Sequence, residues 1–315
     1  MVLYKKIAFA LGLFCIYPAV AQEPESCRTV RFAETGWTDI AATTAVTAQI
    51  LHALGYETEN RLLSVPVTYA ALSMGDIDIF LGYWKPSMTP ELKPYEDNAT
   101  VETVRFNLTG AKYTLAVPQF AYDEGLKSFD DIARFADKLA FSIYGVESGN
   151  DGNRIILSMV DKGAYNLGKF RMVESSEQAM LSEVEARIAA RQPVVFLGWA
   201  PHPMNSRFEM AYLSGGDAFF GPDYGGAMVG TNVRKGYIQE CANVGRLLQN
   251  LEFSLDMENE IMGKILDDRQ EPEKAADAWL RANISSLDAW LDGVKTWDGK
   301  DGLAAVKVSL LSQDN

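Results

Sequence analysis

Histidine is scarce in this sequence, in which only His52 and His202 occur among 315 residues. Two histidines so far apart cannot supply the HExxH pair with which a helix holds catalytic zinc. The sequence also lacks the GxSxG turn that presents a serine nucleophile and the GxxxxGKS/T loop that holds nucleotide phosphates. Zinc-dependent hydrolysis, serine hydrolysis and ATP cleavage therefore have no supporting motif in this chain.

Basic residues are in the minority: 29 Lys and Arg stand against 42 Asp and Glu, which gives a formal charge of −13. A nucleic-acid surface needs clustered Lys and Arg to displace counterions from phosphates, so this balance argues against one. Long hydrophobic runs are missing beyond the N-terminus, so no later segment is expected to span a bilayer. The composition favours a folded, acidic protein of about two domains with a cationic or neutral ligand.

The first 21 residues have the pattern of a secretory signal peptide. A short segment with two lysines precedes an apolar stretch from Ile7 to Val20, and a small-x-small sequence ends at Ala21. The apolar stretch is shorter than the roughly 20 residues of a spanning helix, which argues against a membrane anchor. We therefore predict cleavage before Gln22, loss of Cys15 with the peptide, and export to an oxidising compartment.

Removal of that segment leaves two cysteines, Cys27 and Cys241. In an oxidising compartment, two thiols in one chain are expected to form a disulfide. Such a bridge would tie the start of the mature chain to a segment near its end. The sequence therefore predicts that both termini lie in the same lobe.

From the first of these cysteines onward, short β-branched or aromatic runs alternate with helical periods, the pattern of α/β units with a parallel sheet. The first series includes a strand at Thr29–Glu34, a helix from about Ile40 to Leu54 and a buried strand at Ile77–Trp84. A second series begins near Lys112 and ends in the buried strand Val194–Trp199. The predicted fold class is therefore α/β with two lobes.

The order of these series indicates that the chain starts one lobe, builds a second and then returns to the first. We predict that residues 22–110 and 211–315 form lobe 1 and that residues 111–210 form lobe 2. The two crossings, near Asn107–Lys112 and Arg207–Ser214, would make a two-segment hinge. No low-complexity linker marks either crossing.

Three tryptophans stand where predicted strands end. Trp84 and Trp199 close the similar stretches IDIFLGYWKP and PVVFLGWAPHP, and Trp37 lies in the loop TGWTD after the first strand. Ligands of open parallel sheets bind outside the carboxyl ends of the strands, so the three rings are expected to face a common crevice. Because Trp199 belongs to the other lobe, they can meet only when the lobes close.

Aromatic rings around a cavity suit a quaternary ammonium group, which has no hydrogen-bond donor and is attracted to the faces of the rings. Each contact is worth roughly 0.5–2 kcal/mol, so three or four rings can account for micromolar binding. A sugar site would also use tryptophans, but it would surround them with many polar side chains. Chance placement of tryptophans at domain edges is the remaining alternative.

Several stretches of the chain together resemble a known family. The sequence is similar to the substrate-binding component of bacterial choline ABC importers, within the wider class of betaine and quaternary-ammonium binding proteins. The resemblance covers nearly the whole mature chain, in order, and implies a periplasmic binding protein of type II that closes over choline. The stretches that carry it are GWTDI, SVPVTYAAL, IFLGYWKP, TGAKYTLAVP, SGNDGNR, ESSEQAML, VFLGWAPHPMN and YLSGGD.

The resemblance implies a box of four rings, made by Trp37, Trp84, Tyr113 and Trp199. From its pattern alone, Tyr113 reads as a half-buried strand residue. Asp39, which the family also indicates, has two readings: an N-cap of the following helix, which the residue type favours, or a counter-charge beside the ammonium, which the resemblance favours.

The SGNDGN turn holds two further candidates. The resemblance makes Asn150 the first choice for a hydrogen bond to the choline hydroxyl. Asp151 is the second choice, and its alternative role is to cap the next helix.

Two other functions stay open at this point. A betaine would need a partner for its carboxylate, and His202 is the obvious residue, although the prolines on either side equally suit a rigid turn. An acidic Asp39 would repel that carboxylate, so choline comes first, with acetylcholine and betaine as weaker ligands. An exported enzyme acting on choline esters would need a nucleophile and a base, and neither is recognisable.

The partners and location follow from the class of protein that the chain resembles. We expect a monomer in the periplasm that docks on a membrane permease with its ATPase. No cofactor, metal or nucleic acid is expected.

Overall fold

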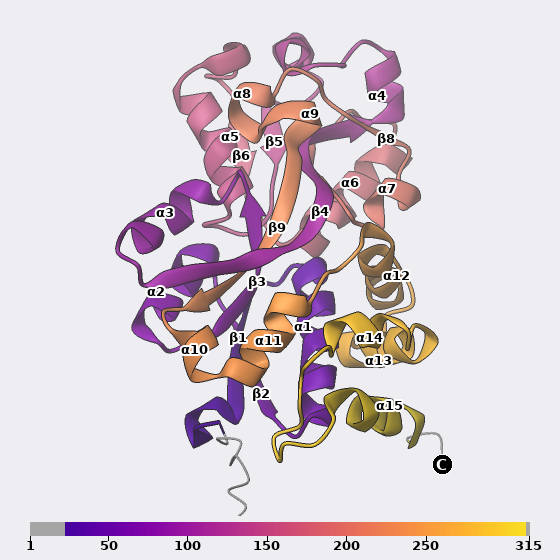
Figure 1. The fold of residues 1–315 in the computed structure, drawn as a ribbon. Coiled ribbons are helices and arrows are strands. Elements are labelled where there is room, and N and C mark those ends of the chain that lie inside the picture. The colour runs from indigo at the N-terminus through magenta and orange to yellow at the C-terminus, as the bar shows by residue number, and fades with distance from the viewer. Residues whose placement is uncertain (1–22, 313–315) are drawn as a thin grey trace, which may run out of the picture.

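The chain folds into two lobes, one built around the first strands and one around the middle of the sequence (Figure 1). The structure is a computed structural model that describes residues 23–312. The predicted signal peptide, residues 1–21 with Cys15, lies outside the described residues. Between residues 23 and 312, no helix combines the length and the apolar character needed to cross a bilayer.

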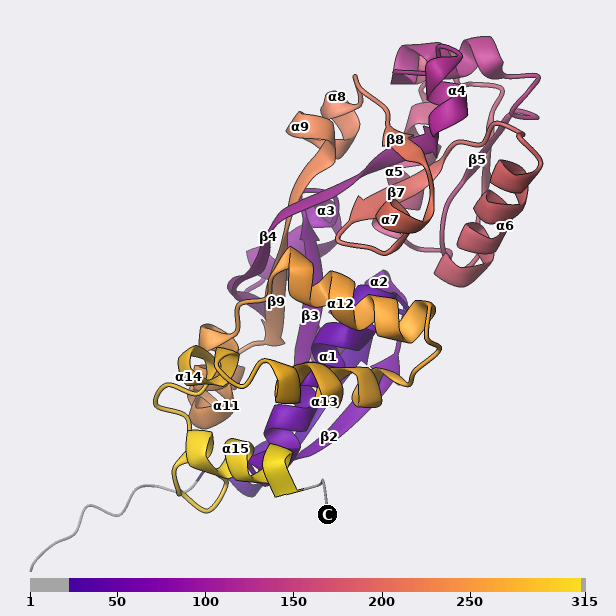
Figure 2. The ribbon, with the colours of Figure 1, turned by 90° about the vertical axis from the view of Figure 1, so that its right-hand side faces the viewer.

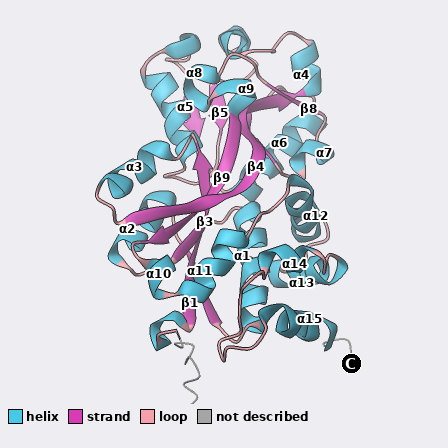
Figure 3. Ribbon diagram, viewed as in Figure 1, coloured by secondary structure: helices cyan, strands magenta, loops and turns pink. Residues whose placement is uncertain are grey.

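A single curled mixed sheet runs through both lobes (Figure 3), in the strand order β2-β1-β3-β9-β4-β7-β5-β6, with β8 paired to β4. Strand β1 lies parallel to β2 and β3, and β5 lies parallel to β6 and β7. The strands are β1 (Thr29–Glu34), β2 (Glu57–Leu62), β3 (Ile79–Lys85), β4 (Val101–Pro118), β5 (Ser142–Tyr144), β6 (Arg171–Val173), β7 (Phe196–Ala200), β8 (Met210–Tyr212) and β9 (Gly226–Arg234). The predicted α/β class with two lobes is confirmed, but the parallel parts are joined by antiparallel pairing of β4 with β9.

Helices pack on both lobes around this sheet. Lobe 1 has α1 (Thr38–Ala53), α2 (Val65–Met74), α3 (Thr89–Asp97), α10 (Tyr237–Glu240), α11 (Ala242–Asn250), α12 (Leu255–Leu266), α13 (Pro272–Ala282), α14 (Ser286–Trp290) and α15 (Gly302–Ser312). Lobe 2 has α4 (Gln119–Asp123), α5 (Asp151–Asp161), α6 (Glu177–Ala189), α7 (Met204–Arg207), α8 (Asp217–Phe220) and α9 (Pro222–Gly225). Short 3₁₀ helices occupy Glu25–Cys27, Phe129–Phe135 and Ala164–Asn166.

Helix α1 lies at the centre of lobe 1, between the sheet and the C-terminal helices α12 and α13 (Figure 2). Twelve of its 16 residues are buried, as expected for a helix with apolar or small residues on every side. It ends at Ala53, and Gly55 follows with a φ of +91°, a left-handed conformation that favours glycine. The opposite, N-terminal end of α1 points toward lobe 2.

The chain passes between the lobes in β4 and β9, as both ribbon views show (Figures 1 and 2). Asn107–Lys112, the predicted first crossing, lies inside β4, and we propose that this strand is the first connection. For the second crossing, predicted at Arg207–Ser214, we propose a later position, because the Ser214 amide still donates to the Lys127 carbonyl of lobe 2 at 3.1 Å. We propose that lobe 1 resumes within β9, so that the hinge consists of two paired strands.

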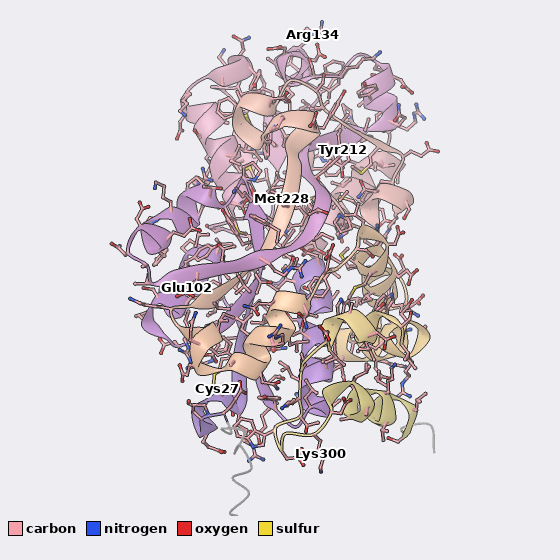
Figure 4. The ribbon with its side chains drawn as sticks, viewed as in Figure 1. Cys27, Glu102, Arg134, Tyr212, Met228 and Lys300 are labelled. Carbon is pink, nitrogen blue, oxygen red and sulfur yellow. A yellow bond between two sulfur atoms is a disulfide. The ribbon has the colours of Figure 1, made fainter. Side chains whose placement is uncertain are left out.

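The predicted disulfide between Cys27 and Cys241 is present. Its Cα atoms are 5.5 Å apart and its partners are 214 positions apart in the sequence. It joins the segment before β1 to the start of α11, at the end of lobe 1 remote from lobe 2 (Figure 4). The C-terminal helix lies in the same lobe (Figure 1), as predicted.

A candidate aromatic site between the lobes

A cavity of about 300 Å³, counting its open side, lies between the two lobes. All seven residues named from the sequence as ligand-binding candidates line it, together with Val146, which the sequence analysis did not single out. The lining residues are Trp37, Asp39, Trp84, Tyr113, Val146, Asn150, Asp151 and Trp199. None of them is basic.

Strand geometry brings three of the rings together. Trp84 lies in β3 and Trp199 in β7, each near the carboxyl end of its strand and each followed by a cis X-Pro bond, Lys85–Pro86 and Ala200–Pro201. Tyr113, in β4, is the direct register partner of Trp199. The Tyr113 ring centroid is 5.8 Å from that of Trp84 and 6.4 Å from that of Trp199. The ring that pattern reasoning did not select therefore stands between the two that it did.

The fourth ring reaches the cavity from the end of α1. Trp37 occupies the N-cap position of that helix and is only 7% exposed. Its indole N–H donates to the Glu147 Oε1 at 2.9 Å, a contact from lobe 1 to lobe 2. The rotation of this ring is thus set by a carboxylate of the opposite lobe.

Asp39 lies in the first turn of α1 and does not cap the helix, so the N-cap reading of this residue is wrong. Its Oδ2 accepts a hydrogen bond from the Trp84 indole N–H at 3.1 Å, while its buried Oδ1 has no partner among the described residues. Burial raises the pKa of Asp39 to about 7, and the nearby Glu177 adds to the rise. Asp39 is not the N-cap because α1 begins at Thr38, so that Trp37 occupies the N-cap position and Asp39 is already the second residue of the helix.

In the SGNDGN turn, Asn150 and not Asp151 caps the following helix. Asn150 caps α5: its Oδ1 accepts from the Asn153 amide at 3.1 Å and from the Tyr113 hydroxyl at 2.9 Å. Asp151 therefore is not the cap. Both of its oxygens are buried without a hydrogen-bond partner in the described chain, and burial raises its pKa to about 7. The Ser87 hydroxyl lies close enough to offset part of that rise.

His202 does not line the cavity. It is 2% exposed, its Nδ1 accepts a hydrogen bond from the Met204 amide at 2.9 Å, and its Nε2 lies 3.3 Å from the Glu177 Oε1. Both ring nitrogens thus have protein partners. The alternative that His202 receives a ligand carboxylate has no support in this arrangement.

Sequence reasoning missed the acidic side chains that surround the box. Glu147 lies in the loop between β5 and α5, Glu177 begins α6 and Glu258 lies in α12. Burial raises the pKa of Glu147 and, well above its ordinary value, that of Glu258. Glu258, in α12, lies near Asp39. A charged residue on an amphipathic helix normally reads as a solvated surface group, so no local signal marks these residues. Together they surround the cavity with carboxyl groups, and in Glu147 and Glu258 burial favours the neutral form.

Gly152 is a second residue that the sequence did not mark. A Cβ at this position would lie 2.1 Å from the Tyr113 hydroxyl oxygen, so only glycine lets helix α5 approach that ring. We predict that Gly152→Ala displaces Tyr113 and weakens ligand binding by about 1–3 kcal/mol, the usual cost of overpacking. Isothermal titration of the purified variant measures this loss. Gly263→Ala inside helix α12, where a Cβ would meet nothing closer than 3.9 Å, is the control, and equal affinities for the two variants would contradict the prediction.

Comparison with known proteins finds one matching family model and several similar proteins. The family model described as the substrate binding domain of ABC-type glycine betaine transport systems matches residues 28–282. A solved ABC-transporter choline binding protein in complex with choline is 60% identical, with a TM-score of 0.91, over 91% of this chain and 100% of that one. Its unliganded semi-closed form has a TM-score of 0.84 at 60% identity, over 91% of this chain and 99% of that one. An uncharacterized protein of Chromohalobacter salexigens is 48% identical over 153 residues, which are 49% of this chain and 98% of that protein.

Proposed function

The chain belongs to the family of substrate-binding domains of ABC-type glycine betaine transport systems, and from this premise we propose that it binds choline for an ABC importer. The observation that carries the proposal is the composition of the cavity between the lobes. Four aromatic rings line it together with the carboxyl groups of Asp39 and Asp151, of which the Asp39 Oδ1 and both Asp151 oxygens are buried without hydrogen-bond partners among the described residues. A quaternary ammonium supplies the positive charge that such a cavity needs.

The same features distinguish choline from glycine betaine. A betaine carries its own carboxylate, and none of the residues that line this cavity has a cationic side chain to receive it. Two buried carboxyl groups would repel it instead. Choline carries only the positive charge and a hydroxyl group, for which Asn150 and Asp151 are the proposed partners. We therefore propose that betaines and acetylcholine are weaker ligands.

Titration of the intrinsic tryptophan fluorescence tests this proposal, because three of the proposed contacts are indoles. Choline is expected to change the signal and to saturate at micromolar concentration, which four ring contacts of roughly 0.5–2 kcal/mol each would provide. Glycine betaine and carnitine are the comparison ligands and should need much higher concentrations. No response to choline at millimolar concentration, or tighter binding of betaine, would overturn the assignment.

The affinity for choline is expected to rise with pH. In the ligand-free protein the pKa values of Asp39 and Asp151 are about 7, so at low pH both groups are largely protonated and neutral. A bound cation favours the charged forms and lowers both pKa values, so binding releases protons and tightens as pH increases through 7. We predict at least a roughly tenfold gain in affinity from about pH 5.5 to about pH 8, measured by calorimetry in buffers of different ionisation enthalpy.

Asp39→Asn is the matched variant for this profile, since it keeps the shape and removes the charge. It should bind choline more weakly at high pH and show a flatter dependence on pH.

The stability of the ligand-free wild-type protein should change in the direction opposite to its choline affinity and fall as pH rises. The folded state holds protons that the unfolded state has lost between the ordinary pKa of 3.8 and about 7, so this contribution to stability falls as pH rises through that range. A pH-independent affinity of the wild-type protein would contradict this assignment of charge.

The family is one of transport proteins, and we propose that this chain acts by binding without catalysis. The competing function, hydrolysis of choline esters, is tested by incubation with acetylcholine and chromatography of the products. Release of choline at a rate proportional to protein concentration would overturn the binding role. We further propose that the protein acts as a monomer in the periplasm, and that a membrane permease with its ATPase receives the closed form.

A further inference from the structure

Helix α1 begins without a side-chain cap of its own, because the N-cap position is occupied by Trp37. The missing acceptor comes from the other lobe. The Glu177 Oε2 accepts a hydrogen bond from the Thr38 amide at 3.0 Å, and its Oε1 accepts one from the Thr38 hydroxyl. An acidic acceptor is favoured here because the first amides of a helix lack internal partners and its N-terminal end is positive. The cap of α1 is therefore complete only when the lobes are together.

Glu177 is fully enclosed in this position, with 1% of its surface exposed. It is the first residue of α6, in lobe 2, and a third donor reaches it from the same lobe. The His202 Nδ1 accepts from the Met204 amide, so the neutral ring carries its proton on Nε2, 3.3 Å from the Glu177 Oε1. A buried carboxylate with donors from both lobes loses its lobe 1 partners when the cleft opens, and water must replace them.

The contact between Glu177 and Thr38 also lies next to residues that line the ligand cavity. Thr38 lies between Trp37 and Asp39, both of which line the cavity, whereas Glu177 does not line it. We propose that Glu177 is a closure latch: it holds the N-terminus of α1 in lobe 1, positions Trp37 and Asp39, and slows release of the ligand without contacting it. This inference rests on the proposed function for the identity of the ligand.

Other polar contacts between the lobes are less protected. Arg154 of lobe 2 pairs with Glu91 of lobe 1 and donates to the Ser87 carbonyl at 2.7 Å, but the Arg154 side chain is 43% exposed. Exposed ion pairs contribute little because water and salt screen them. Glu177 is buried away from water. Loss of its contact with Thr38 should therefore shorten the lifetime of the closed state more than loss of the Arg154 contacts.

The test measures choline affinity by calorimetry and choline release by stopped-flow fluorescence in Glu177→Ala and Thr38→Val. The control is Glu185→Gln on the same helix, an exposed residue that pairs with Arg207 inside lobe 2. We expect Glu177→Ala to bind roughly 10- to 100-fold more weakly, mainly through faster release. Thr38→Val keeps its amide and should lose less, and the control should stay within about twofold of the wild type. The melting temperature without ligand should match that of the control, which a merely structural role of Glu177 would not allow.

The double variant completes the experiment. If the latch is real, Thr38→Val costs little affinity once Glu177→Ala is present, because the two changes remove the same contact. Additive losses, or a Glu177→Ala release rate equal to that of the control, would refute the latch.

Wild-type affinity for choline separately tests the proposed function. If another quaternary ammonium compound binds instead, the same ratios are measured with it. If none binds, energy transfer between dyes on the two lobes must show a wider separation in Glu177→Ala than in the ligand-free wild type, and equal separations refute the latch.

Discussion

Trp84→Ala and Trp199→Ala are each expected to weaken choline binding by about 2–4 kcal/mol, a loss of roughly 30- to 1,000-fold in affinity. Both indole rings contact the Tyr113 ring directly, so truncation of either one opens one wall of the cavity to water. Trp84→Ala has a second effect, because the indole N–H that it removes is the hydrogen-bond donor to Asp39. That carboxyl would then be buried without this partner, which costs further free energy.

Conservative variants separate the contributions in this experiment, which isothermal titration measures. Trp84→Phe keeps a ring face and removes the donor to Asp39, so it should lie between the wild type and Trp84→Ala. Tyr113→Phe keeps its ring and loses only the hydrogen bond to Asn150, so it should have a smaller effect. Losses restricted to residues of one lobe would contradict closure of both lobes around the ligand. Alanine variants with unchanged affinity would exclude the aromatic box altogether.

Removal of the disulfide in a Cys27→Ala/Cys241→Ala variant is expected to lower the free energy of unfolding by about 3–5 kcal/mol. The bridge closes a loop of 214 positions, and a loop of this length removes much conformational entropy from the unfolded chain. Replacing both cysteines avoids a lone buried thiol. Urea unfolding, followed by circular dichroism at constant temperature, measures the change.

Choline affinity is the internal control for this second prediction. The bridge precedes the amino end of β1, whereas Trp37 follows the carboxyl end of the same strand. The opposite ends of the strand separate the two sites, so affinity at a temperature where the variant is folded should stay within about threefold of the wild type. An unchanged urea midpoint would show that the bridge does not restrict the unfolded chain as expected.

Part of the site could be inferred from local sequence. Buried strands that end in tryptophan place Trp84 and Trp199 at the carboxyl ends of strands in the two lobes, which is where ligands of α/β sheets bind. If the predicted signal peptide with Cys15 is removed, Cys27 and Cys241 are the two remaining cysteines of the sequence and could only pair with each other. Tyr113 needed the family resemblance, since its pattern is that of any strand tyrosine, and its position opposite Trp199 depends on the register of β4 and β7.

Other parts could not be inferred, because they depend on contacts between residues far apart in the chain. The Asp39 residue type suggested a helix cap, but the helix begins at Thr38 and Asp39 instead receives the indole N–H of Trp84. The later return to lobe 1 that we propose has no local signal, because residues 211–225 have no composition that distinguishes a lobe 2 segment from a linker. Glu177 resembles an ordinary acidic residue in the first turn of a helix.

The sequence by itself determined the alternation of strands and helices, the pair of cysteines and the aromatic residues at strand ends, because each depends on neighbouring residues and their spacing. Only the tertiary structure decided which carboxyl groups are buried, which residue caps α1 and where the hinge strands lie. Burial and hydrogen bonding across the cleft depend on how the two lobes meet, and no periodic pattern within one segment encodes that meeting.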